Sequence, residues 1–256
     1  MTLGPTTVCV VVLALLLPAP AASQATERFV LRGHAQTLRL SGRRDGYPAI
    51  VSSGDGGWIH LAPQVAAMLA ARGFFVVGFD SKAYLESFTS GATTLTVRDV
   101  PADYRALARF AAGRSSQKPL LIGVSEGAAL SVLAATDAGV KTLVAGVIGL
   151  GLGDSNELGW RWKDSLIYLT HGIPNEPQFS TIALAGRVAP TPLAVINSTH
   201  DEYVPPGEVD LILAAAQQPK RLWMIASADH RFSDNQAELA PRLFEAIAWV
   251  HSSQPK

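Results

Sequence analysis

The stretch from residue 120 to residue 127 constrains the fold of this chain more than any other. An apolar run, Leu-Leu-Ile, leads into Gly-Val-Ser-Glu-Gly at 123–127, and apolar residues at helical spacing follow. A strand, a tight turn and a helix in this order present a serine hydroxyl at the tip of the turn. A side chain at either neighbouring glycine would obstruct that strained turn. The pattern predicts a nucleophilic Ser125 beside a helix N-terminus, whose dipole favours a developing oxyanion. A plain small-residue turn is the alternative.

The other apolar runs alternate with helical segments, and this alternation predicts the architecture. We expect an opening hairpin at the sheet edge from residues 27–32 and 37–40. Further strands are expected at 47–51, 74–79, 120–122, 143–150, 192–197 and 221–226. Helices are expected near 61–72, 99–112, 126–133 and 207–216, with a closing helix that Pro241 begins or kinks. For residues 151–188 we predict a short irregular excursion of the chain over the site. The whole pattern predicts a mostly parallel sheet covered by helices on both faces.

The composition is typical of a compact enzyme. The chain has 256 residues, of which 48% are hydrophobic and 16% are charged, and this argues against disorder. Its 21 basic and 21 acidic side chains balance, and no Lys/Arg block occurs, so we expect no nucleic-acid partner. No group of His, Asp and Glu has metal-ligand spacing, so we expect neither a metal nor another cofactor.

The first 25 residues predict a secretory signal peptide, which leaves 26–256 as a single mature domain. They contain no charged side chain, and the apolar run 8–17 is too short to span a bilayer. Small residues follow and offer cleavage sites after Ala21 or Ala25. The single cysteine, Cys9, lies inside the apolar run, so we expect the mature chain to have no disulfide, no thiolate and no transmembrane segment. An uncleaved interfacial segment is the alternative.

Two later loops supply the partners that a serine nucleophile needs. The loop 198–205 follows a predicted strand and carries Asp201, and the loop 227–232 follows the next strand and carries His230. The carboxyl ends of parallel strands share one edge of the sheet, so these side chains should meet Ser125 there. We predict Ser125 as the nucleophile, His230 as the general base and then acid, and Asp201 as the group that orients His230. Taken singly, Asp201 could be a cap and His230 a surface residue.

One acid and five histidines compete with this assignment. Glu202 adjoins Asp201 and could exchange roles with it. His200 lies in the same loop as Asp201, where we expect it to pack or to form a hydrogen bond, and His60 begins a helix. The other histidines have no matching position after a strand: His34, His171 and His251. The order of Ser, Asp and His along the chain therefore favours the first assignment.

An oxyanion hole needs two backbone N–H donors near the nucleophile. The first should be the N–H of Glu126, which follows Ser125. The second should come from Asp55 or Gly56, in the loop Gly-Asp-Gly-Gly at 54–57, because glycine lets a backbone approach the substrate closely. A phosphate-binding loop is the competing interpretation, but the Gly-Lys-Ser/Thr ending is missing.

Three motifs together resemble one known family. Ser-Gly-Asp-Gly-Gly-Trp at 53–58, Gly-Phe-Asp-Ser at 78–81 and Gly-Val-Ser-Glu-Gly at 123–127 are similar to the bacterial VirJ/AcvB virulence-protein family of α/β-hydrolases. The resemblance implies an α/β-hydrolase fold, a periplasmic location and serine esterase activity. It further implies a lysyl-phosphatidylglycerol-type ester as substrate, as for AcvB members, and secretion-system proteins as partners, as for VirJ.

Charge near the site offers an independent hypothesis about the substrate. We expect Asp55, Asp80, Glu126 and Glu202 at the rim, where carboxylates would favour a cationic head group such as a lysyl ester. We assign substrate contacts to Asp55, Asp80, Glu202 and Trp58. The aromatic residues of the excursion would meet acyl chains or pack in the core: Trp160, Trp162 and Tyr168. The alternative functions are a non-catalytic periplasmic binding module and a hydrolase of a small soluble ester.

Overall fold

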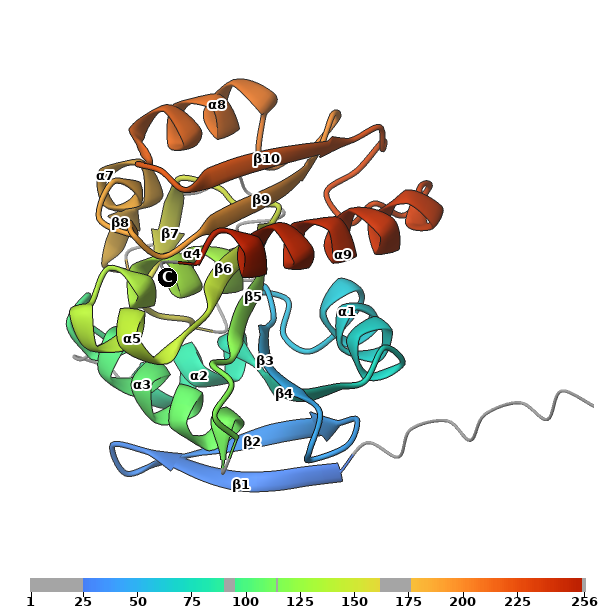
Figure 1. Ribbon diagram of the computed structural model, residues 1–256. Helices are drawn as coiled ribbons and strands as arrows, with labels where there is room; N and C mark the ends of the chain where they lie inside the picture. The colour runs from blue at the N-terminus through green and yellow to red at the C-terminus, as the bar shows by residue number, and fades with distance from the viewer. Residues whose placement is uncertain (1–24, 90–94, 114, 162–175, 255–256) are drawn as a thin grey trace, which may run out of the picture.

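The computed structural model of the protein describes residues 25–89, 95–113, 115–161 and 176–254. Eight strands form one sheet in the order β1-β2-β4-β3-β5-β6-β9-β10 (Figure 1). The first two strands are an antiparallel hairpin, and the six from β4 to β10 run parallel to one another. The strands are β1 (Ala25–Leu31), β2 (His34–Ser41), β3 (Tyr47–Ser52), β4 (Phe74–Phe79), β5 (Leu120–Val124), β6 (Gly146–Leu150), β9 (Leu193–Ser198) and β10 (Lys220–Ile225).

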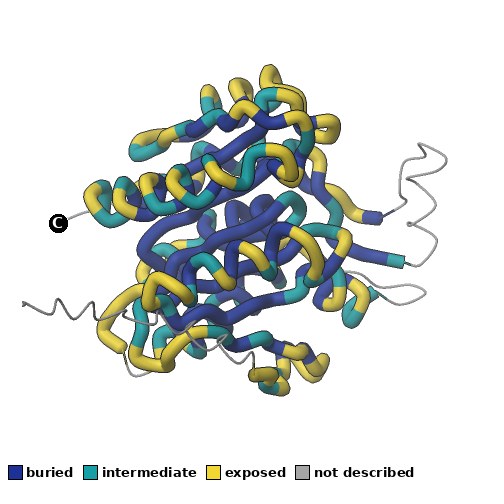
Figure 2. The backbone as a smooth tube through the Cα atoms, turned by 90° about the vertical axis from the view of Figure 1, so that its right-hand side faces the viewer, coloured by how far each residue is buried: buried dark blue, intermediate teal, exposed yellow. Residues whose placement is uncertain are grey.

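Helices cover both faces of this sheet and create two apolar cores. α1 (Leu61–Ala70) and α9 (Gln236–Ser252) pack on one face. The other face carries α2 (Ser81–Phe88), α3 (Asp99–Ala112), α4 (Glu126–Ala135), α5 (Ala138–Leu143), α7 (Thr181–Ala185) and α8 (Pro206–Ala215). Successive strand residues alternate between the cores, as the pleat requires: Ile50 faces the α3 and α4 side, and Val51 the opposite one. β5, β6 and β9 are buried along their whole length (Figure 2).

The predicted α/β-hydrolase architecture is confirmed, with local differences. No element was assigned to 81–88, yet α2 forms there because the Asp80 carboxylate accepts the Ala83 N–H at 3.1 Å and caps the helix. The strand expected at 143–150 begins only at Gly146, because Asp137 caps a helix that ends at Leu143. Pro241 lies inside α9, five residues after its start.

The predicted excursion contains regular structure where it is described. β7 (Ser155–Glu157) pairs antiparallel with β8 (Gln178–Ser180), and α7 follows directly. The signal-peptide prediction with Cys9, and the predictions for Trp162, Tyr168 and His171, lie outside the described residues. Across the parts of the chain that are described, the helices are all too short or too polar to cross a membrane.

Candidate active site

Ser125 sits at a strained turn between β5 and α4. Its backbone angles are φ 51° and ψ −120°, a region that residues other than glycine rarely adopt. A Cβ at position 123 would lie 2.2 Å from the Gly127 carbonyl oxygen, and one at 127 would lie 2.4 Å from that of Ser53. Both flanking glycines are therefore required by close backbone approach, as the sequence pattern predicted.

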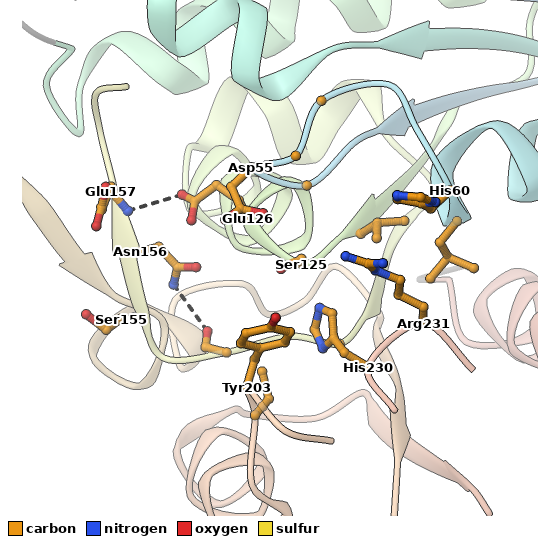
Figure 3. Close-up of a pocket in the computed structure, with 18 of the residues that line it drawn as sticks. Asp55, His60, Ser125, Glu126, Ser155, Asn156, Glu157, Tyr203, His230 and Arg231 are labelled. Carbon is orange, nitrogen blue, oxygen red and sulfur yellow. Dashed lines mark hydrogen bonds between the residues drawn. The ribbon is translucent and has the colours of Figure 1, made fainter. Parts of the chain in front are cut away.

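A pocket of about 690 Å³ opens at the carboxyl edge of the sheet, above this turn (Figure 3). Its lining includes residues from the loop after β3, the elbow, the β7 hairpin and the loops after β9 and β10. Segments far apart in the chain thus meet at one cavity, where open α/β sheets hold their ligands. Ser125 and His230 both line it.

His230 is bonded to Asp201 in the pocket wall. Its Nδ1 lies 2.6 Å from Oδ2 of Asp201, whose side chain is 0% exposed. Oδ1 of Asp201 accepts the N–H groups of Tyr203 at 2.9 Å and Val204 at 2.8 Å, which fixes the carboxylate. An ionised carboxylate can only accept, so Nδ1 carries the proton and Nε2 of the neutral ring is left as a proton acceptor.

That Nε2 atom is buried and free to act. Among the described residues it has no hydrogen-bond partner, Ser125 included. Figure 3 shows the imidazole turned toward Ser125 across the pocket. Catalytic hydrogen bonds of this kind are often long in empty sites and tighten when substrate binds. The arrangement can accept the serine proton once the hydroxyl and the ring approach each other.

Three neighbours hold His230 in place. Gly151, at φ +63°, lies so close that a Cβ there would stand 2.4 Å from Cε1 of the ring. Tyr203 packs edge-on at a centroid distance of 5.4 Å. Glu202 accepts the backbone N–H of His230 at 2.7 Å. Glu202 is therefore a positioning residue; it does not line the pocket among the described residues, contrary to the substrate contact we expected.

The loop 54–57 lies directly against the nucleophile. A hydrogen bond of 3.0 Å from the Gly57 N–H to the Gly54 carbonyl closes the loop, and a Cβ on Gly54 would lie 3.2 Å from Cβ of Ser125. Asp55 and Gly56 line the pocket, as does Glu126. The Glu126 N–H, at the first position of α4, has no acceptor in the described part of the chain. This geometry suits an oxyanion hole built from the predicted residues.

Trp58 and Asp80 support this loop, and neither is among the described residues that line the pocket. The indole of Trp58 packs on Gly78, where a Cβ would come within 2.3 Å of it. Oδ2 of Asp80 accepts the Trp58 N–H at 3.3 Å and pairs with Arg39 at 3.5 Å. The contacts of these two residues are thus internal, which corrects the expectation that they touch substrate.

Carboxyl groups gather on one side of the pocket. Oε1 of Glu126 accepts the Glu157 N–H at 3.2 Å, and Asp55 lies beside them (Figure 3). Burial, and then the negative charges of Asp55 and Glu157, raise the pKa of Glu126 well above its usual value. The cluster was expected for Asp55 and Glu126. Glu157 was missed because it lies in the irregular segment, where no strand-end signal marked it.

The opposite side of the pocket carries His60 and Arg231, neither of which was predicted as a site residue. In the sequence, His60 was marked by the start of a helix and Arg231 by its position next to His230.

His34, His200 and His251 lie outside the pocket lining. Trp160 is buried in the core, as one of its two expected roles requires, and it also lines the pocket wall. Its contact with acyl chains stays a prediction. In the ranges that the structure describes, no group of three His, Cys, Asp or Glu side chains is placed to hold a metal ion.

The parallel sheet, the elbow at Ser125 and the loops after β9 and β10 define an α/β-hydrolase fold. Residues 47–161 match the sequence model of a family described as bacterial virulence protein (VirJ). This match confirms the resemblance to the VirJ family over those residues. Comparison with curated protein sequences gives no significant match.

Solved structures share the fold over most of the chain. The esterase domain of a Rhodothermus marinus protein is 20% identical, with 90% of this chain and 98% of that one covered and a TM-score of 0.60. Est1E from Butyrivibrio proteoclasticus is 14% identical, with 87% and 99% covered and a TM-score of 0.63. A membrane phospholipase A, described as a novel bacterial virulence factor, is 10% identical, with 89% and 86% covered and a TM-score of 0.63.

Proposed function

We propose that the protein is a serine esterase that works through an acyl-enzyme on Ser125. One observation carries the proposal: the buried Asp201 holds His230 at 2.6 Å, and the opposite ring nitrogen is unpartnered among the described residues in the Ser125 pocket. A serine hydroxyl is a poor nucleophile at neutral pH, and an oriented imidazole is the base that activates it. The esterases among the structural neighbours support this chemistry.

The reaction has two halves. Nε2 of His230 takes the hydroxyl proton as Oγ of Ser125 bonds to the ester carbonyl carbon, and the oxyanion meets the N–H of Glu126 and the 54–57 loop. The ester C–O bond then breaks, and the leaving alcohol takes the proton from Nε2. Water next attacks the acyl-enzyme, giving its proton to Nε2, which returns it to Oγ as the acid leaves.

The substrate we propose is a cationic aminoacyl ester of a phospholipid, of the lysyl-phosphatidylglycerol type. Asp55, Glu126 and Glu157 would attract an ammonium group on the acyl side, and such a cation would favour the ionised form of Glu126. The VirJ-family match and the fold shared with a membrane phospholipase A support a lipid ester. The apolar leader at 1–25 supports a periplasmic location, and secretion-system proteins remain proposed partners.

A fluorophosphonate probe combined with lipid turnover tests this function. Wild type should be labelled and should release lysine from lysyl-phosphatidylglycerol vesicles. Ser125→Ala should do neither. Ser252→Ala removes an exposed serine on α9 that lies outside the pocket lining, and it should behave as wild type. Folded wild-type protein that takes up no probe and hydrolyses no ester would overturn the proposal, whereas hydrolysis of soluble esters alone would overturn the lipid substrate.

A further inference from the structure

Several titratable side chains of the pocket lie on opposite sides of Ser125. Figure 3 shows Asp55, Glu126 and Glu157 on one side of Ser125, and Arg231 and His60 on the other. An ester that binds across Ser125 has two ends, so the two sides meet different parts of it.

The position of His230 decides which end lies where. Its Nε2 must protonate the leaving oxygen, so the leaving alcohol has to lie on the His230 side of the scissile bond. Arg231 is the next residue in the chain, and its guanidinium extends into the pocket between Ser125 and His60 (Figure 3). Groups attached to the leaving alcohol therefore come next to Arg231, and the acyl group extends toward the carboxylates.

Arg231 is held by its backbone, while its side chain remains available. Its N–H donates to Oδ1 of Asp229 at 3.0 Å, and its carbonyl accepts from Nε2 of Gln236 at 3.1 Å. The guanidinium has no ion-pair partner among the described residues, although carboxyl groups line the same pocket. A planar, permanently charged guanidinium suits bidentate binding of a phosphate.

His60 adds a second donor at the same place. It precedes α1 with φ 54° and ψ −112°, a strained conformation for a residue with a side chain. It makes no side-chain cap on this ten-residue helix, and the first helical residue, Leu61, also lines the pocket wall. The positive helix end and the imidazole both favour an anion there.

We infer that Arg231 and His60 form a subsite for a phosphate carried by the leaving alcohol of the ester. This inference rests on the proposed esterase function and identifies the residues that recognise the alcohol. The substrate is then dipolar: its ammonium faces the carboxylates and its phosphate faces Arg231.

Matched soluble esters test this subsite without a membrane. Lysyl esters of glycerol and of glycerol 3-phosphate differ only in the phosphate on the leaving alcohol. Wild type should prefer the phosphate ester in kcat/KM by roughly 10- to 100-fold, the size expected for charge-assisted hydrogen bonds. Arg231→Gln should abolish most of this preference, Arg231→Lys should keep part of it, and His60→Gln should reduce it less than Arg231→Gln does.

The control variant and a binding measurement make the outcome decisive. Arg28→Gln changes an exposed arginine on β1, outside the pocket lining, and should retain the wild-type preference. Glycerol 3-phosphate should bind to Ser125→Ala in calorimetry, and Arg231→Gln should weaken this binding roughly 10-fold or more. An unchanged preference and unchanged binding in Arg231→Gln would overturn the subsite. So would an effect of Arg231→Gln confined to phospholipid vesicles, because the arginine would then act in membrane adsorption.

The binding measurement also separates the two proposals. If no ester is hydrolysed but glycerol 3-phosphate binding depends on Arg231, the esterase function fails and the phosphate subsite stands. If esters are hydrolysed without regard to the phosphate, the esterase stands and the subsite fails.

Discussion

Gly151→Ala should cripple catalysis by displacing His230 while the fold survives. A Cβ at this position would lie 2.4 Å from Cε1, 2.9 Å from Nδ1 and 3.0 Å from Nε2 of the ring. The closest of these contacts is about 1 Å shorter than ordinary van der Waals contact, so the imidazole must retreat by about that distance. The buried Asp201 cannot move with the ring, because two backbone N–H groups fix its carboxylate. The 2.6 Å hydrogen bond between Asp201 and His230 therefore cannot be kept.

A displacement of about 1 Å at a catalytic group costs on the order of 10²-fold in rate. We therefore expect kcat for p-nitrophenyl acetate to fall by roughly that factor. The positive φ of +63° adds a backbone cost of about 1–2 kcal/mol for alanine, which should lower the thermal midpoint without unfolding the protein.

Gly33→Ala separates these two effects. Gly33 has φ +90°, and a Cβ there would meet nothing within 4 Å. This variant should share the loss of stability and keep full esterase activity. If the Gly151→Ala variant is folded and as active as the Gly33→Ala variant, Gly151 does not set the position of His230 and the reasoning is refuted.

Three further perturbations test other parts of the account. Asp201→Asn should lower kcat roughly 10⁴-fold, because the amide favours the wrong imidazole tautomer; activity within tenfold of wild type would exclude this role. Glu126 has a raised pKa in the folded state, so its ionisation costs stability as pH rises through that pKa. Thermal melts of Glu126→Gln should therefore show a gain over wild type at pH 8 and none at pH 4, and an equal effect at both would contradict the burial of the charge. Asp103 is buried and accepts from both Arg32 and Tyr84, so Asp103→Leu should lower the urea-unfolding free energy by about 2–4 kcal/mol. A loss below 1 kcal/mol would mean that this network does not anchor the opening hairpin.

The parts of the site that local sequence determines could be predicted. The elbow follows from glycines that flank Ser125 where backbones touch, and no other residue type fits those contacts. Asp201 and His230 follow buried strands, and parallel strands bring their carboxyl ends to one edge. These inferences needed only the order of elements and the chemistry of the side chains.

Side-chain directions in the loops could not be predicted. Asp80 was expected at substrate, but a cap on α2 and the Trp58 N–H occupy its two oxygens. Glu202 carries the same charge as Asp201 and adjoins it, yet it accepts a backbone N–H of His230. Sequence shows which residue types lie in a loop, whereas the packing of neighbouring elements decides which of them enter the pocket.

His60 and Arg231 were missed for a related reason. A histidine before a helix and an arginine beside a catalytic histidine carry no periodic signal. Their significance depends on the loops after β3 and β10 meeting across the pocket, which is a long-range contact. A search for charged residues adjacent to each predicted catalytic position would have found Arg231, and the helix start would have drawn attention to His60.

Trapping the covalent intermediate tests the central claim most directly. Wild-type protein quenched with acid during turnover of an ester, then digested and analysed by mass spectrometry, should carry the acyl group on the peptide that contains Ser125. His230→Ala, treated identically, should carry none. An acyl group found on another residue, or turnover with no acylated peptide under conditions where deacylation is slowed, would contradict the account.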